Sequence, residues 1–121
     1  MKRIIFACSL LPALLLAAPA AFAHAFLDRA VPAVGSTVHQ SPAEVRVWFT
    51  EAVEPAFSTI AVLDVQGRHV EAGKAKVDPS DPRLLEVALK TLGPGKYKVV
   101  WKVISVDTHR TEGDFAFTIA P

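Results

Sequence analysis

The sequence predicts an all-β fold: a Greek-key antiparallel β-sandwich of the immunoglobulin-like class, with about seven strands over residues 24–121. Three observations lead to this fold class. Apolar and polar residues alternate with period two in several short segments, and clusters of Gly, Pro and Asp separate those segments. No amphipathic helical repeat of useful length appears.

Residues 1–23 predict a cleaved secretory signal peptide. Lys2 and Arg3 supply a positive start, and residues 4–18 form an apolar run that no acidic residue interrupts. The stretch closes with Ala21-Phe22-Ala23, the small-x-small pattern that signal peptidase recognises. We therefore expect cleavage after Ala23.

Two other interpretations of this segment are weaker. A transmembrane anchor is disfavoured because Pro12 and Pro19 interrupt a run barely long enough to cross a bilayer. A lipoprotein would use Cys8, but only seven residues precede it and most of the apolar run follows it.

The expected mature chain is one domain, residues 24–121, with 98 residues (121 less 23). Without Lys2 and Arg3 it keeps 11 basic residues against 12 acidic ones, a net charge of −1. This balance indicates neither a nucleic-acid nor a membrane-surface partner. Because Cys8 is the only cysteine, the mature chain contains no disulfide.

The first clear strand covers residues 44–50, where Val45, Val47 and Phe49 share one face and Arg46 lies on the other. Two apolar, β-branched runs follow, at residues 57–65 and 84–89. Turn signals bound these runs, at Gln66-Gly67, Asp78-Pro79, Asp81-Pro82 and Gly93-Pro94-Gly95.

The last two strands are predicted at residues 96–103 and 115–119, and we expect them to pair. Tyr97 opens the first of them just after a Gly-Pro-Gly turn, a position typical of a tyrosine corner. Trp101 alternates in register with the apolar face, which favours core packing over a sugar-stacking role. Trp48 falls opposite the apolar face of its own strand.

Cleavage after Ala23 makes His24 the first residue of the mature chain. The amine and the imidazole Nδ1 of an N-terminal histidine can bind one metal ion together, so one residue supplies two nitrogen ligands. Chance alone places histidine there in a few per cent of secreted chains, roughly, so this feature needs a second observation.

The second observation is Asp107-Thr108-His109, between two predicted strands. Side chains two apart on an extended segment point the same way, so a carboxylate and an imidazole are offered to one site. A surface turn with a hydrogen-bonded histidine is the alternative. His39 and His69 lie beside turns without a partner histidine at ligand spacing, which predicts surface residues.

The segment from Leu92 to His109, followed by Gly113 and Phe115, resembles the C-terminal signature of the CopC family of periplasmic copper-resistance proteins. The N-terminal His24-Ala25-Phe26-Leu27 with Pro32 also resembles that family, as does the segment 45–54 with Phe49-Thr50-Glu51. The resemblance covers nearly the whole expected mature chain.

This resemblance implies a β-sandwich that binds copper(II) through the amine and imidazole of His24, Asp107 and His109. Glu51 matches a glutamate near the site that would orient a ligand by accepting a hydrogen bond. The alternative for Glu51 is a solvated carboxylate at a strand end. The implied protein is a periplasmic monomer and not an enzyme; it buffers copper or carries it to an inner-membrane importer of the CopD type.

Two departures from the family pattern bear on the metal. Thr108 stands where the family often has glycine, which restricts the loop without removing a ligand. Met1 is the only methionine and leaves with the signal peptide, so the methionine-rich copper(I) site of some members is absent. Three nitrogens and a carboxylate suit copper(II), at the peak of the divalent affinity series, with zinc as the competitor.

Two other functions remain open at this point. A copper mono-oxygenase also uses an N-terminal histidine and a second histidine, but it needs an open copper position and a substrate surface. A structural immunoglobulin-like interaction module would make His24 an accident of cleavage. Failure to bind copper(II) would indicate the structural module, and oxidation of polysaccharide would indicate the enzyme.

Overall fold

The structure, a computed structural model, describes residues 24–121, so the predicted signal peptide at residues 1–23 lies outside the described residues. Eight strands form the domain, with one 3-10 turn, η1 (Pro55–Phe57), between the third and fourth. The strands are β1 (Leu27–Val31), β2 (Thr37–Val38), β3 (Glu44–Phe49), β4 (Thr59–Leu63), β5 (Lys76–Asp78), β6 (Asp81–Ala88), β7 (Gly95–Ile104) and β8 (Arg110–Ile119).

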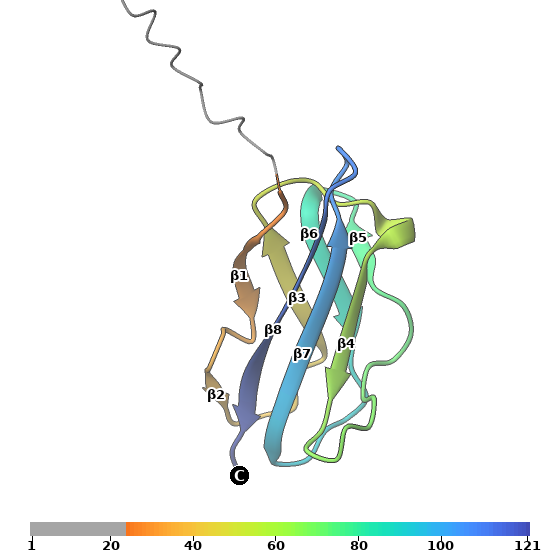
Figure 1. The fold of residues 1–121 in the computed structure, drawn as a ribbon. Coiled ribbons are helices and arrows are strands. Elements are labelled where there is room, and N and C mark those ends of the chain that lie inside the picture. Colours follow the sequence, from red (N-terminus) through yellow and green to blue (C-terminus); the bar gives the residue numbers. More distant parts are fainter. Residues whose placement is uncertain (1–23) are drawn as a thin grey trace, which may run out of the picture.

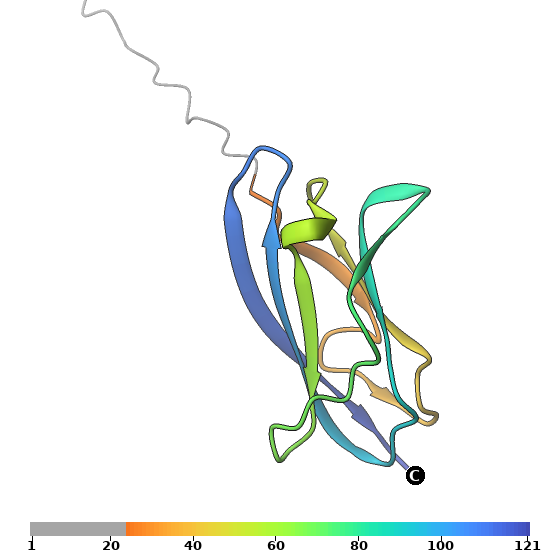
Figure 2. The ribbon, with the colours of Figure 1, turned by 90° about the vertical axis from the view of Figure 1, so that its right-hand side faces the viewer.

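The strands make two four-stranded sheets, in the orders β1-β3-β6-β5 and β2-β8-β7-β4. The sheets lie face to face as a sandwich (Figures 1 and 2), which confirms the predicted all-β sandwich. The pairing of β7 with β8 also confirms the prediction for the last two strands and extends from Gly95↔Ile119 to Ile104↔Arg110.

The sandwich differs from the prediction in having eight strands and one parallel pair, β2 with β8. β2 is two residues long, too short to show an alternation in the sequence. Backbone hydrogen bonds attach this segment to the edge of β8, from Gly35 N to Ala116 O at 2.7 Å and from Thr118 N to Ser36 O at 2.9 Å.

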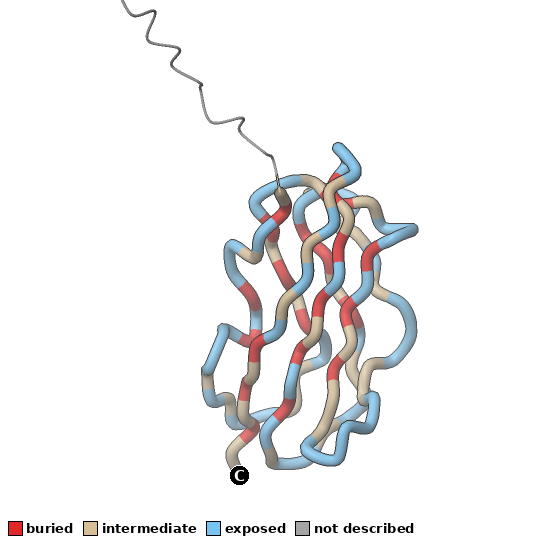
Figure 3. The backbone as a smooth tube through the Cα atoms, in the orientation of Figure 1, coloured by how far each residue is buried: buried red, intermediate tan, exposed pale blue. Residues whose placement is uncertain are grey.

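Alternation determines which side chains fill the space between the sheets. In β3, Val45, Val47 and Phe49 are at most 1% exposed, and β7 alternates in the same way. Burying one such side chain contributes roughly 1.5 to 3 kcal/mol of stability. The tube in Figure 3 shows buried and more exposed positions alternating along the long strands.

The two tryptophans lie on opposite sides of their sheets. Trp101 is buried, and a Cβ on Gly113 would lie 2.5 Å from its ring, so the close approach requires glycine. Trp48 is half-buried on the outer face, with the guanidinium carbons of Arg29 and Arg46 at 3.9 and 4.9 Å from its ring centroid. Both placements agree with the sequence alternation.

The predicted tyrosine corner is confirmed, because the Tyr97 hydroxyl donates to Gly93 O at 2.7 Å. Tyr97 lies near the start of β7, where Gly95 pairs with Ile119, and β7 begins at the end of the sandwich that carries the C-terminus (Figure 1). At the opposite end, the first described residues approach the turn between β7 and β8 (Figures 1 and 2). The fold therefore brings His24 to the predicted Asp-x-His motif.

Candidate metal centre

The β7–β8 turn holds Asp107 and His109. Thr108 N donates to Ser105 O at 2.8 Å and Ser105 N donates to His109 O at 3.0 Å, which closes the turn tightly. Thr108 adopts a left-handed conformation with φ of 71°, uncommon for a β-branched residue. The prediction assumed an extended segment; a turn brings the two side chains together instead.

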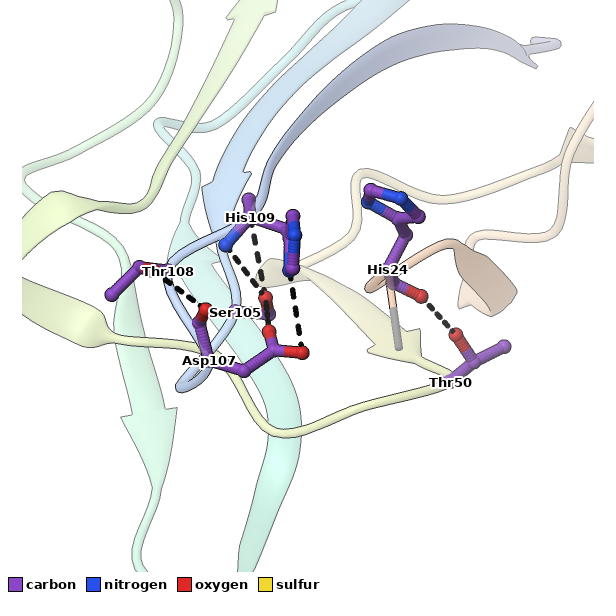
Figure 4. A network of polar contacts seen from close by, with 6 residues as sticks. All are labelled: His24, Thr50, Ser105, Asp107, Thr108 and His109. Atoms are coloured by element: carbon purple, nitrogen blue, oxygen red, sulfur yellow. Dashed lines mark hydrogen bonds and ion pairs between the residues drawn. The ribbon is translucent and has the colours of Figure 1, made fainter. Parts of the chain in front are cut away.

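Asp107 and His109 face each other across this turn, with 3.3 Å between Asp107 Oδ2 and His109 Nδ1 (Figure 4). The hydroxyl of Ser105 donates to Asp107 and lowers the pKa of that carboxyl below its ordinary value of 3.8. Desolvation acts in the opposite direction, and His109 lowers the pKa further. Asp107 is therefore a carboxylate at neutral pH and available as an oxygen ligand.

Ser105 organises the turn, and the sequence reasoning missed it. Its side chain is fully buried, its Oγ contacts Asp107 Oδ1 and His109 O, and it accepts the His109 N–H at 3.2 Å. A signal was present, because residue 105 continues the inward register of Val99, Trp101 and Val103. A hydroxyl at a buried position needs hydrogen-bond partners, and here they belong to the predicted ligands.

The N-terminal segment reaches the site from the other sheet. Thr50 Oγ1 donates to His24 O at 3.1 Å (Figure 4). The same hydroxyl oxygen accepts from Phe26 N at 3.0 Å. Thr50 N also donates to Phe26 O at 2.8 Å. Further along, Thr111 Oγ1 donates to Ala25 O at 2.5 Å. Residues 24–26 are thus held by groups of both sheets.

These contacts place the two predicted histidines side by side. The ring centroids of His24 and His109 are 4.6 Å apart, with the ring planes at 68°, and Phe26 flanks His24 at 5.8 Å. Both histidines are half-buried. The structure thus brings together all three residues predicted to bind metal, as two pairs that share His109.

Within residues 24–121, no group of three or more His, Cys, Asp or Glu side chains is arranged to hold a metal ion. One ligand of the predicted site is not a side-chain atom: it is the main-chain amine nitrogen of His24. In the full-length chain this atom is a peptide nitrogen. The donor types present, two imidazoles and a carboxylate, still fit copper(II), since residues 24–121 contain no Cys or Met sulfur to favour copper(I).

The remaining predicted residues lie as follows. Glu51 is exposed and directly follows Thr50. Its role as a hydrogen-bond acceptor for a ligand stays a prediction. His39 and His69 are exposed, as expected. His69 Nδ1 lies 2.7 Å from Glu71 Oε1. Burial acts to raise the pKa of the Glu71 carboxyl, but hydrogen bonds from Val62 N and His69 outweigh burial and lower this pKa below its ordinary value.

Residues 24–121 include no helix long and apolar enough to cross a membrane. A family model described as the CopC domain matches residues 27–120. Protein YobA of Escherichia coli (strain K12) is 34% identical over 105 residues, which cover 86% of this chain and 85% of that protein. Copper transport protein CutJ of Bacillus subtilis (strain 168) is 31% identical over 99 residues, 81% of this chain but 18% of that protein.

Solved structures show the same fold. CopC from Methylosinus trichosporium OB3b is 39% identical, with a TM-score of 0.76 over 81% of this chain and 95% of that one. PcoC, described as a methionine-rich copper resistance protein from Escherichia coli, is 30% identical. Its TM-score is 0.68 over 81% of this chain and all of that one.

Proposed function

The chain belongs to the CopC domain family, and from this premise we propose that its processed form binds one copper(II) ion in the periplasm. The proposed ligands are the amine and the imidazole of His24, the imidazole of His109 and the carboxylate of Asp107. Glu51 is proposed to orient one of these ligands. Signal-peptide cleavage after Ala23 would create the amine ligand.

One observation carries this proposal: the 4.6 Å separation of the His24 and His109 rings at the end of the sandwich where the N-terminal segment enters. The two histidines come from distant parts of the chain, and Asp107 lies beside one of them. Two imidazoles, an ionised carboxylate and a terminal amine form a donor set that suits copper(II) in a tetragonal geometry.

We propose that the bound copper is cargo, buffered or carried, and that the protein is a monomer that does not turn over a substrate. The family relationship supports a copper-related role. The chain matches 18% of Copper transport protein CutJ, so a similar domain forms part of a longer protein that is named for copper transport. This match supports the proposal that the protein delivers copper to a partner, a membrane importer of the CopD type.

The test is copper(II) titration of protein that begins at His24, with a competing chelator of known affinity and electron paramagnetic resonance to count nitrogen ligands. We expect one copper(II) ion bound through three nitrogens. His109→Ala should weaken binding strongly, whereas His39→Ala and His69→Ala, which remove exposed histidines elsewhere, should leave it unchanged. Zero stoichiometry, or equal losses in all three variants, would contradict the proposal.

A further inference from the structure

The proposed copper ligands come from two parts of the chain that none of the strand pairings described for residues 24–121 connects directly. His24 precedes β1 in one sheet, whereas His109 precedes β8 in the other. A terminal residue that binds metal through both its amine and its imidazole must have its Cα fixed relative to the second histidine. The contacts that attach residues 24–26 to the sandwich therefore control the geometry of the site.

Thr111 makes the contact that links this segment to the β8 side of the site. It lies two positions after His109 at the start of β8, where it pairs with Val103 of β7. Its hydroxyl donates to Ala25 O at 2.5 Å, across 86 positions of sequence. One hydrogen bond thus joins the residue after His24 to the strand that begins immediately after His109.

The burial of both groups makes this bond consequential. Ala25 is 0% exposed and Thr111 is half-buried. A buried carbonyl that loses its donor is penalised by desolvation, so the segment would shift to recover a partner. Thr50 donates to His24 O from the opposite sheet, so residues 24 and 25 are each held by a threonine hydroxyl.

We propose that Thr111 is a positioning residue for the copper site: by donating to Ala25 O, its hydroxyl attaches the residue next to the N-terminal histidine to the strand that begins directly after the second histidine. This inference rests on the proposed function for its consequence in copper binding. The attachment itself is a property of the metal-free protein. Thr111 does not contact the metal; it acts by keeping the His24 backbone in place, which is preorganisation of the ligand set.

The decisive variant is Thr111→Val, which removes the hydroxyl and keeps the β-branched shape. Thr111→Ser keeps the hydroxyl and removes the methyl group. Thr118→Val is the matched control, because Thr118 lies on the same strand at the far end, paired with Lys96. Thr111→Ala gives the same loss of hydroxyl in case the valine variant does not fold.

In protein that begins at His24, we expect Thr111→Val to weaken copper(II) about tenfold in chelator competition and to alter the copper hyperfine coupling. Thr111→Ser and Thr118→Val should resemble wild type in both measurements. The inference is overturned if Thr111→Val binds copper as wild type does with the same spectrum, or if Thr111→Ser is as impaired as Thr111→Val.

A metal-free measurement separates this inference from the proposed function. The Phe26 amide donates to Thr50, so its hydrogen exchange reports how firmly the N-terminal segment is attached. We expect faster exchange of this amide in Thr111→Val than in Thr118→Val. If wild type bound no copper, the proposed function would fail, but the exchange of this amide would still test whether Thr111 holds the N-terminal segment in place. Equal exchange in the two variants would show that it does not.

Discussion

Replacing Ser105 by alanine should disrupt the β7–β8 turn more than any other single-atom deletion near the site. The side chain is fully buried, and its hydroxyl contacts Asp107, the His109 amide and the His109 carbonyl. Each net hydrogen bond contributes about 1 kcal/mol, and a buried amide left without a partner costs about 1 to 3 kcal/mol. We therefore expect Ser105→Ala to lose about 2 kcal/mol of unfolding free energy.

For a domain of this size, that loss lowers Tm by about 10 °C, since 1 kcal/mol corresponds to about 4 to 8 °C. Ser58→Ala is the matched control, because Ser58 is also buried but its Oγ accepts only the Ile104 amide among the hydrogen bonds described for residues 24–121, at 3.2 Å. The control should lose about 1 kcal/mol.

Urea unfolding and copper(II) competition on protein that begins at His24 measure both effects. Ser105→Ala should weaken copper(II) binding because Asp107 and His109 lose their common anchor, whereas Ser58→Ala should not. The reasoning is refuted if the two serine variants are equally stable and bind copper equally well.

Three further predictions concern the same turn and its metal. Thr108→Gly should raise Tm by a few degrees in a thermal melt. The left-handed conformation of Thr108 costs about 1 to 2 kcal/mol, and glycine would relieve it, while the greater freedom of glycine in the unfolded chain would offset only about 0.5 to 1 kcal/mol of that gain. An unchanged or lower Tm would show that Thr108 is not strained. The lowered pKa of Asp107 means that its contribution to metal-free stability is present above its unfolded pKa of about 3.8 and is lost as pH falls through its lower folded pKa. Wild type should therefore exceed Asp107→Asn in urea unfolding at neutral pH by a margin that closes in strong acid, and a margin independent of pH would contradict this. Reduction should release the metal, because residues 24–121 lack the cysteine and methionine sulfur that copper(I) prefers; a copper(I)-specific chelator under anaerobic conditions tests this, and copper(I) held as tightly as copper(II) would contradict it.

The sandwich could be predicted because its long strands carry their burial pattern in the sequence. In β3 and β7 every second residue is buried, and polar residues occupy many of the positions between them. β2 and β5 could not be predicted, since two or three residues do not establish a period. The pairing of β2 with β8 depends on backbone hydrogen bonds, to which the side chains give no clue.

The candidate site divides in the same way. His24 and His109 were identified from the cleavage motif and from the family resemblance, and the fold brings them together. Ser105 was detectable in principle, as a hydroxyl in an inward register. Thr111 was not, because its partner is a backbone carbonyl distant in sequence, and only the folded chain brings the two together.

The most direct test of the account compares copper(II) affinity between protein that begins at His24 and protein that keeps one additional residue, Ala23. The extra residue turns the proposed amine ligand into a peptide nitrogen, which has no available lone pair until it loses a proton, and leaves the His24, Asp107 and His109 side chains unchanged. We predict that binding weakens by orders of magnitude and that the resonance spectrum changes its nitrogen pattern. Equal affinity and identical spectra for the two proteins would contradict the proposed role of the N-terminal histidine.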